Sequence, residues 1–438
     1  MKIDISKYNI LHEFSNIKYI YFCRLLHHIK YLSENLLRYT MFFTDLRFLF
    51  TILFFGTYDV YGLEELKHDK VVVCYVASWA TYRLPDCTFS IENLKPEHCT
   101  HLVYSFAGLD TASWTIKSTD PWTDTEKDGI GNYRKMTALR EKYPGLKVTL
   151  GIGGWNEGSI GYSALASSSD RRKIFIASTI AFLKTYGFNG LDFVWMYPGH
   201  NGGSWEDKQN FAVLLKELSE AYKQPGLSLT AAVSAVQETI NLGYNISEMS
   251  KYVDHLHVMA FDYHGSWNQK VISHAPLRSS DGLSVNDSIT YLLEQGAPAE
   301  KLVLALPMYG RTFVLTTPPE KPVNPIGLPA LPNGFRGPCT AQDGIMGYNE
   351  ICATQKENPK DWTIGWDSDS SSAYAINKDH VIVYDDIKSM EAKVKYIKEK
   401  KLAGVKIWSI DTDDFHGKCN GSDYPLMKAI NAALAGTL

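Results

Sequence analysis

Residues 190–196 read Gly-Leu-Asp-Phe-Val-Trp-Met, a short and mostly apolar run that is typical of a buried strand. Seven further runs of this kind occur along the chain, at 71–75, 101–106, 147–152, 227–233, 255–261, 302–307 and 404–410. Helical patterns such as 171–186 and 207–222 separate most of them. Eight strands with intervening helices predict an α/β fold, a parallel (β/α)8 TIM barrel.

The interval between the seventh and eighth runs is too long for one helix. It is rich in Pro, Gly, Ser and aromatic residues and contains strand-like pieces at 361–366 and 380–384. We therefore predict a small α+β insertion domain over 314–383, carried by a barrel that spans 63–313 and 384–438.

Composition excludes some classes of function. The chain has 438 residues, of which 45% are hydrophobic and 21% are charged, which suits a folded globular protein. Lys and Arg number 44 against 48 Asp and Glu, so there is no basic excess and we expect no nucleic-acid partner. No metal or nucleotide motif is present in the sequence, so no metal and no cofactor are expected.

The amino-terminal part differs from the rest. Arg47 precedes the apolar run 48–55, which has the length of a signal-peptide core, and Val60-Tyr61-Gly62 offers small residues for cleavage. Residues 41–62, beginning at Met41, are predicted to be a signal peptide, and 1–40 an upstream extension; an uncleaved anchor is the alternative. With cleavage, the mature chain is expected to be extracellular and to have no membrane span.

Cysteines and sequons agree with export. Six of the seven cysteines follow residue 62, an even number that is compatible with an oxidising compartment. Sequons for N-glycosylation begin at three positions: Asn245, Asn286 and Asn420.

Active sites of such barrels lie at the carboxyl ends of the strands, which directs attention to 188–198. This stretch, Phe-Asn-Gly-Leu-Asp-Phe-Val-Trp-Met-Tyr-Pro, resembles the fourth strand of the family 18 glycoside hydrolases, the chitinases, which carries Asp-Gly-x-Asp-x-Asp-x-Glu followed by Tyr-Pro. Segments 153–156, 259–267, 307–311 and 408–415 also resemble that family, in the same order. The resemblance covers nearly all of the chain from about residue 70.

The departures from the family pattern decide the expected function. Met196 stands where the family has its catalytic Glu, and Val194 where an Asp orients the acetamido group of the substrate. The first Asp of the motif is Asn189, and the tyrosine of the sixth strand is Phe261; Asp192 alone remains.

The resemblance implies a reaction in which the N-acetyl oxygen of the substrate is the nucleophile and an acid protonates the glycosidic oxygen. A thioether has no proton to give, and valine cannot orient an amide. The sequence thus predicts a pseudoenzyme with no intact catalytic residue. We interpret Asp192 as a buried carboxylate satisfied by neighbouring donors rather than as a catalytic group.

A sugar-binding cleft is still expected, because pyranose rings stack their apolar faces on aromatic rings. The resemblance implies that Trp408 forms the floor, that Tyr75 and Phe106 lie at the base, and that Trp79 and Trp155 stack at the two ends. Further positions match contacts to the bound sugar: Tyr197, Met259, Asp262, Tyr309 and Arg311. For Tyr75 and Phe106, simple filling of the barrel interior is an equal alternative. Trp267 and Trp366 are additional candidates that packing explains equally well.

The resemblance also implies two disulfides, Cys74 with Cys99 and Cys352 with Cys419. Cys87 and Cys339 have no family partner: they pair with each other, remain free or bridge molecules.

Taken together, these features predict a secreted, inactive chitinase-like protein that binds chitin or other N-acetylglucosamine-containing glycans. One alternative is a growth-factor-like signalling protein whose barrel is a scaffold for a cell-surface or matrix protein. The other is a weak residual glycoside hydrolase that uses Asp192 or Asp262.

Overall fold

The computed structural model describes residues 68–437 apart from residue 322. The predicted extension (1–40), the signal peptide (41–62) and Cys23 lie outside the described residues.

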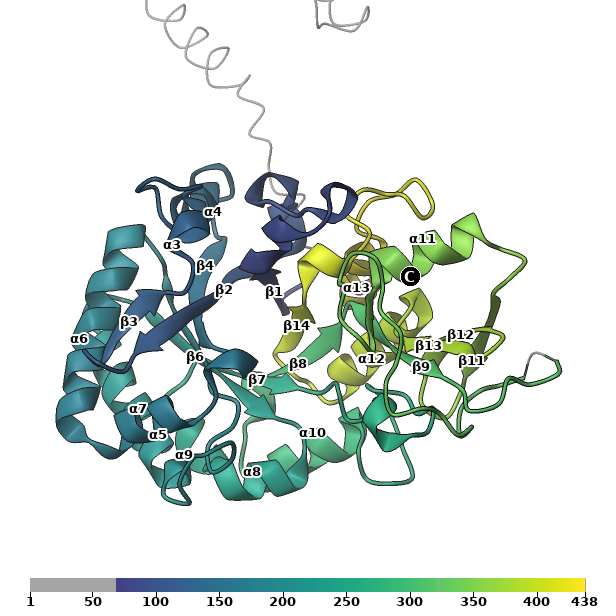
Figure 1. Cartoon of the computed structure of the whole chain (residues 1–438). Coiled ribbons are helices and arrows are strands. Elements are labelled where there is room, and N and C mark those ends of the chain that lie inside the picture. Colours follow the sequence, from purple (N-terminus) through teal and green to yellow (C-terminus); the bar gives the residue numbers. More distant parts are fainter. Residues whose placement is uncertain (1–67, 322, 438) are drawn as a thin grey trace, which may run out of the picture. The chain divides into compact units, whose positions relative to one another are not determined.

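Eight parallel strands close into a barrel (Figure 1). Each pairs with its neighbour in the order β1-β14-β8-β7-β6-β5-β4-β2, and β1 pairs with β2 to complete the ring. The strands are β1 (Val71–Ala77), β2 (His101–Asp110), β4 (Lys147–Gly153), β5 (Gly190–Val194), β6 (Ser228–Ser234), β7 (His255–Met259), β8 (Leu302–Pro307) and β14 (Gly404–Trp408). The predicted (β/α)8 barrel is confirmed.

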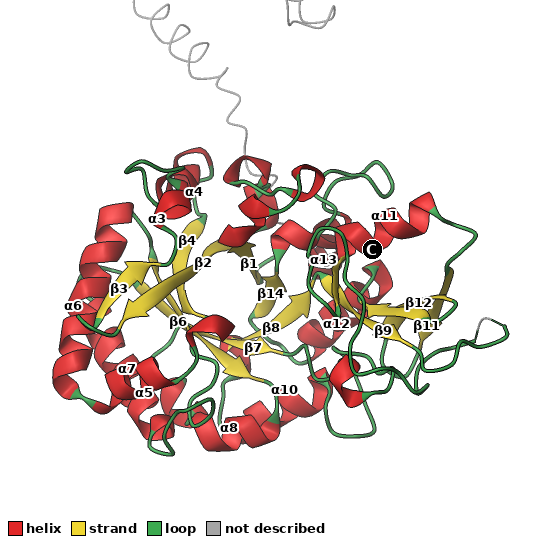
Figure 2. Ribbon diagram, viewed as in Figure 1, coloured by secondary structure: helices red, strands yellow, loops and turns green. Residues whose placement is uncertain are grey.

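Helices surround the barrel on its outer side (Figure 2). They are α3 (Pro121–Asp124), α4 (Asn132–Lys142), α5 (Ile160–Ser167), α6 (Ser169–Tyr186), α7 (Asp207–Tyr222), α8 (Gln237–Gly243), α9 (Ile246–Met249), α10 (Val285–Glu294), α12 (Ile387–Glu399) and α13 (Pro425–Ala435). Local signals set several of their ends: the Ser168 side chain caps α6, and Gly187 ends that helix in a left-handed conformation. Within residues 68–437, apart from 322, no helix has the length and apolar character needed to cross a bilayer.

The strand ends differ from the sequence prediction. β5 stops at Val194 rather than Met196, and β14 stops at Trp408 rather than residue 410. In addition, β2 continues to Asp110 and pairs in antiparallel fashion with β3 (Thr115–Ser118), a hairpin that the sequence analysis did not predict.

A second, antiparallel sheet fits the predicted insertion domain. Its strands run in the order β10-β9-β13-β12-β11, and helix α11 (Tyr348–Glu357) packs beside them. Their bounds are β9 (Tyr309–Val314), β10 (Ile345–Gly347), β11 (Thr363–Asp367), β12 (Ser372–Asn377) and β13 (His380–Tyr384). The sheet begins at Tyr309, ahead of residue 314, so β8 leads almost directly from the barrel into it.

Three disulfides are formed within residues 68–437. Cys74–Cys99 and Cys352–Cys419 are the two pairs that the resemblance implied. Cys87 bonds to Cys339, which resolves the open alternatives for these two residues and joins the segment after β1 to the insertion.

Two apolar clusters flank the barrel wall. The larger one fills the space between strands and helices and includes Phe193 and Trp195. The smaller one lies inside the barrel and includes Val194 and Met259, with Met196 and Trp408 packed against it. Alternation along β5 therefore sends Asp192 and Val194 inward and Phe193 outward, as expected.

Candidate functional site

Aromatic side chains gather at the carboxyl ends of the barrel strands. Trp408, the last residue of β14, is half-buried, and the ring of Phe106 stacks on it at a centroid distance of 5.9 Å. The ring of Tyr75 meets that of Trp408 edge-on, with 5.7 Å between the centroids. The centroid of the Trp79 ring lies 6.2 Å from those of both Trp408 and Phe106. Four of the predicted cleft residues thus form one cluster: Tyr75, Trp79, Phe106 and Trp408. Trp79 lies beside Trp408, the expected floor, whereas the resemblance implied a place at one end of the cleft.

A cavity of about 560 Å³ lies beside this cluster; Trp79 and Trp408 line it, whereas Tyr75 and Phe106 do not. Trp79, Asp262, Tyr309 and Trp408 line it, as predicted for a sugar-binding cleft. The other walls, which the sequence analysis did not predict, come from 82–84 after β1 and from 338–342 of the insertion. The Cys87–Cys339 disulfide joins these two walls.

Asp262 is fixed by three neighbours. It accepts hydrogen bonds from the Tyr309 hydroxyl at 2.7 Å and from Arg311 Nε at 2.8 Å, and His274 Nδ1 lies 3.4 Å away. Burial opposes its charge, but the Arg311 guanidinium, its hydrogen bond and the nearby His274 ring hold the pKa of Asp262 well below its usual value. Trp267 joins this group, because the Arg311 guanidinium lies 4.9 Å from its ring.

The positions at which the sequence analysis expected lost polar groups have mostly apolar surroundings. Val194 is buried in the inner cluster, and Met196 and Phe261 pack against that cluster together with Trp408. Asn189 has a structural role, since its Oδ1 accepts the backbone N–H of Val148 at 2.8 Å. These side chains supply no proton donor beside the cleft floor.

Asp192 is fully buried and surrounded by donors. The Tyr75 hydroxyl and the Thr230 hydroxyl donate to its two oxygens, and His257 Nδ1 lies 3.0 Å from Oδ1. Burial alone would raise the pKa of Asp192, but His257, the Lys406 ammonium and the Thr230 hydroxyl lower it to about 2.

Lys406 is a buried cation directly beneath the floor. Its Nζ lies 3.9 Å from the centroid of the Tyr75 ring and 5.9 Å from that of Trp408. Burial lowers the pKa of Lys406 to about 8, and the Asp192 carboxylate opposes that shift. The sequence analysis missed Lys406, His257 and Thr230; the signal that could have found them is their inward-facing position on otherwise apolar strands.

The remaining predicted residues occupy different places. Met259 is buried in the inner cluster. Tyr197, three residues beyond the end of β5, packs against both the inner and the outer cluster. Burial and Asp262 raise the pKa of its hydroxyl to about 12. Trp155 is 68% exposed and has no ring partner among the described residues. Trp366 packs in the insertion, with the Lys388 ammonium 4.0 Å from its ring centroid.

Other side chains bear on modification and metal binding. Asn420 is exposed, whereas Asn245 caps α9 and Asn286 lies within α10, where it accepts from the Tyr396 hydroxyl at 3.4 Å. Cys352, Asp414 and Cys419 lie close together, but the two sulfurs form a disulfide and offer no thiolate to a metal.

The chain is thus a (β/α)8 barrel with an antiparallel insertion sheet, and it has an aromatic cluster and an Asp–Arg pair at the carboxyl ends of its strands. The model of glycosyl hydrolases family 18 matches residues 71–413, and the chain belongs to that family.

Similar proteins include enzymes and an inactive relative. Probable chitinase 2 of Drosophila melanogaster is 44% identical over 395 residues, which cover 84% of this chain and 81% of that protein. The crystal structure of the Ostrinia furnacalis Group IV chitinase matches with a TM-score of 0.80 at 40% identity and covers 84% of this chain and 100% of the other. Human YKL-39, described as a pseudo-chitinase with retained chitooligosaccharide binding properties, matches with a TM-score of 0.76 at 34% identity, over 83% and 99% of the two chains.

Proposed function

We propose that this protein is a secreted, catalytically inactive member of family 18 that binds chitin or other N-acetylglucosamine-containing glycans. The observation that carries the proposal is the contrast within one site. Met196, Val194 and Phe261 form an apolar patch where the family places its reactive side chains, while the aromatic floor around Trp408 is kept.

The surviving carboxylates are poor acids. Asp192 is fully buried, with its pKa lowered to about 2, and Asp262 is paired with Arg311. A general acid must hold its proton near the working pH, so both groups are ionised when a proton is needed. This argues against the residual hydrolase that uses Asp192 or Asp262.

The activity test is hydrolysis of a fluorogenic chitobioside. We expect turnover at background for the natural chain, because acid–base help of roughly 10²–10⁴-fold is missing along with the orienting groups. The triple variant Val194→Asp, Met196→Glu, Phe261→Tyr is expected to gain activity. Turnover by the natural protein that disappears on Asp192→Asn or Asp262→Asn would refute the inactive assignment.

The binding test is a titration with chitohexaose followed by tryptophan fluorescence. We expect saturable quenching that Trp408→Ala abolishes, because a pyranose ring loses its stacking surface. Trp114→Phe is the matched control, since Trp114 packs under the Arg171 guanidinium, 4.2 Å from its ring. No fluorescence change up to millimolar chitohexaose would favour the signalling-scaffold alternative, which cell-surface crosslinking then tests.

Three disulfides and the exposed Asn420 sequon support secretion. Mass spectrometry of the protein recovered from culture medium is the direct test. We expect an amino terminus near residue 63, three intact disulfides and a glycan on Asn420. A product retained in cells with its cysteines reduced would overturn this part of the proposal.

A further inference from the structure

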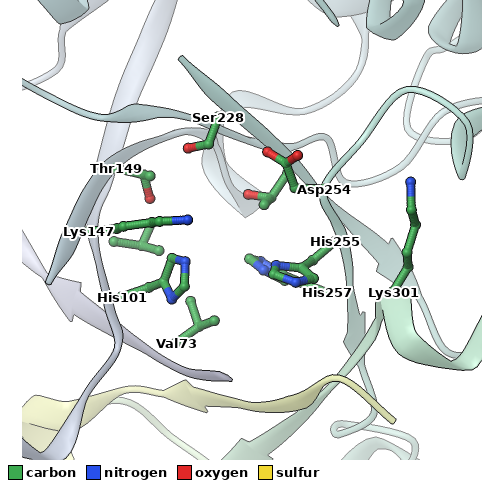
Figure 3. Close-up of a pocket in the computed structure, with 11 residues that line it drawn as sticks. Val73, His101, Lys147, Thr149, Ser228, Asp254, His255, His257 and Lys301 are labelled. Atoms are coloured by element: carbon green, nitrogen blue, oxygen red, sulfur yellow. The ribbon is translucent and has the colours of Figure 1, made fainter. Parts of the chain in front are cut away.

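A second cavity, of about 330 Å³, lies at the opposite end of the barrel, where the strands begin (Figure 3). Four strands contribute their first residue to its lining: His101 from β2, Lys147 from β4, Ser228 from β6 and His255 from β7. Barrel interiors are ordinarily filled by branched apolar side chains. This ring is polar, and β5 opens with Gly190, which has no side chain to fill the space.

His257, two residues along β7 from His255, points a nitrogen without a partner at this cavity. Its Nδ1 lies 3.0 Å from the Tyr75 hydroxyl and 3.0 Å from Asp192 Oδ1. The ring is 1% exposed and lines the cavity, and its Nε2 has no hydrogen-bond partner among the described residues. Because a carboxylate accepts only, Nδ1 carries a hydrogen; a proton on Nε2 then gives an imidazolium paired with Asp192 and a donor aimed into the cavity.

The charged side chains around the cavity differ in whether they already have hydrogen-bond partners. The Lys301 ammonium is already bound to the carbonyls of Ser250 and Val253, at 2.7 and 2.8 Å, and Figure 3 shows it at the edge of the group. Lys147 is exposed at the start of β4 and forms no ion pair or side-chain hydrogen bond within the described part of the chain, and in Figure 3 its nitrogen points toward the other lining side chains. Asp254 supplies the one carboxylate of the lining, and it accepts the Leu229 N–H at 2.9 Å.

We propose that this cavity binds a small oxyanion of phosphate or sulfate size, held by the Lys147 ammonium, Nε2 of His101, a ring nitrogen of His255 and Nε2–H of His257; Nδ1 of His101 is already hydrogen-bonded to the Thr100 hydroxyl at 2.7 Å. The site is separate from the sugar cleft and adds a function to the one proposed above. The cavity places the Lys147 ammonium beside three histidine rings, whose N–H groups would donate hydrogen bonds to a bound anion.

Binding is expected to take up protons. In the empty cavity, burial and the Lys147 charge lower the pKa of His101 to about 3, and burial and His257 lower that of His255 to about 4. An anion between these rings favours their charged forms, so affinity rises as the pH falls. The other charged and titratable groups that face them are Lys147, Lys301 and Asp254 around the cavity, with Asp192, Tyr75 and Lys406 beyond His257.

Isothermal titration of the folded chain with inorganic phosphate, and separately with sulfate, tests the site. We expect one saturable site with a Kd of about 1 mM or below. Affinity should be tighter at about pH 5.5 than at about pH 7.5, and heats should depend on the ionisation heat of the buffer because protons are taken up.

Two variants locate the site. Lys147→Gln and His255→Gln are each expected to weaken binding about tenfold or more, since each removes a charge-assisted hydrogen bond. Lys173→Gln, at an exposed lysine of α6, is the matched control and should bind like the natural chain. Thermal melts verify that the variants fold, and chitohexaose titration should be unchanged in all of them, which separates this site from the cleft.

The absence of a saturable site below about 10 mM of either anion would overturn the proposal. So would binding by a folded Lys147→Gln variant that equals that of the natural chain, because the anion would then be held elsewhere.

Discussion

Asp192, Tyr75, Thr230 and His257 form a buried polar group in the middle of the barrel, and Lys406 lies close enough to lower the pKa of Asp192. The sequence analysis interpreted Asp192 as a buried carboxylate satisfied by its neighbours, and the structure has this arrangement. Such a group stabilises the fold only while the carboxylate is charged, which makes its contribution dependent on pH.

The sign of that dependence follows from the pKa of about 2, against an ordinary value of 3.8. The contribution of Asp192 is complete above the ordinary value and is lost as the pH falls toward 2, a change of about 2 kcal/mol in the free energy of unfolding. We expect Asp192→Asn to flatten this acid limb in urea unfolding measured at several pH values. Asp361→Asn, at an exposed residue, is the control; an acid limb in Asp192→Asn as steep as that of the natural chain would contradict the prediction.

Some residues of the candidate site could be predicted from the sequence and others could not. Trp408, Asp262 and Tyr309, which the resemblance to family 18 singled out, line one cavity. Lys406 and His257 were missed because a basic residue in a strand is ordinarily placed on an exposed face, although alternation puts them on the same inner face as Trp408 and Met259.

At the scale of elements, helix α13 depends on one buried carboxylate. Asp413 accepts the backbone N–H of Leu426 and Met427 in the first turn of that helix, and also that of Asp414. Burial raises the pKa of Asp413 from 3.8 to about 7, and the three N–H donors offset this only in part.

Two substitutions at Asp413 distinguish its role as a hydrogen-bond acceptor for the first turn of α13 from the effect of its charge on stability. Asp413→Ala is expected to lower the free energy of unfolding by about 1–3 kcal/mol, because buried N–H groups lose their acceptor. Asp413→Asn keeps one acceptor oxygen and should cost less.

The pH profile gives a second readout at this position. Between about pH 4 and 7 the folded chain holds a proton on Asp413 that the unfolded chain has released, so this group makes stability fall as the pH rises. Chemical unfolding across that range should show this component in the natural chain and lack it in both variants. A profile unchanged by either substitution would refute the assignment.

The presence of the barrel strands was predicted from the sequence more accurately than the residues at which they end. The apolar run at 190–196 continues past the end of β5 at Val194, because Trp195 packs in the outer core although it is no longer part of the strand. The β2–β3 hairpin was missed because its second strand, Thr115–Ser118, is short and mostly polar.

At the scale of the whole molecule, the insertion supplies one wall of the cleft. Its segment 338–342 faces 82–84, and Cys87–Cys339 bonds the two across 252 residues of sequence. The sequence predicted the insertion and left this bond open, because spacing alone does not show which cysteines approach each other.

Replacing this disulfide should therefore affect binding as well as stability. Cys87→Ser with Cys339→Ser is expected to lower the free energy of unfolding by about 2–5 kcal/mol and to weaken chitohexaose binding, because the two walls are no longer tied. Cys74→Ser with Cys99→Ser is the control: this pair connects β1 to the start of β2, so stability should fall while affinity is kept. If both double variants bind chitohexaose equally well, the Cys87–Cys339 disulfide is not needed to hold the wall of the cleft in place.

The ammonium of Lys406 beneath Trp408 has a consequence for any attempt to recover hydrolysis. Glycosidic bond cleavage develops positive charge on the sugar ring, which an active floor must tolerate. Here the Lys406 ammonium offsets part of the negative charge of Asp192 and so disfavours an oxocarbenium-like ring above it. The variant with Val194→Asp, Met196→Glu and Phe261→Tyr leaves that repulsion in place, so an uncharged residue at position 406 should raise its turnover further.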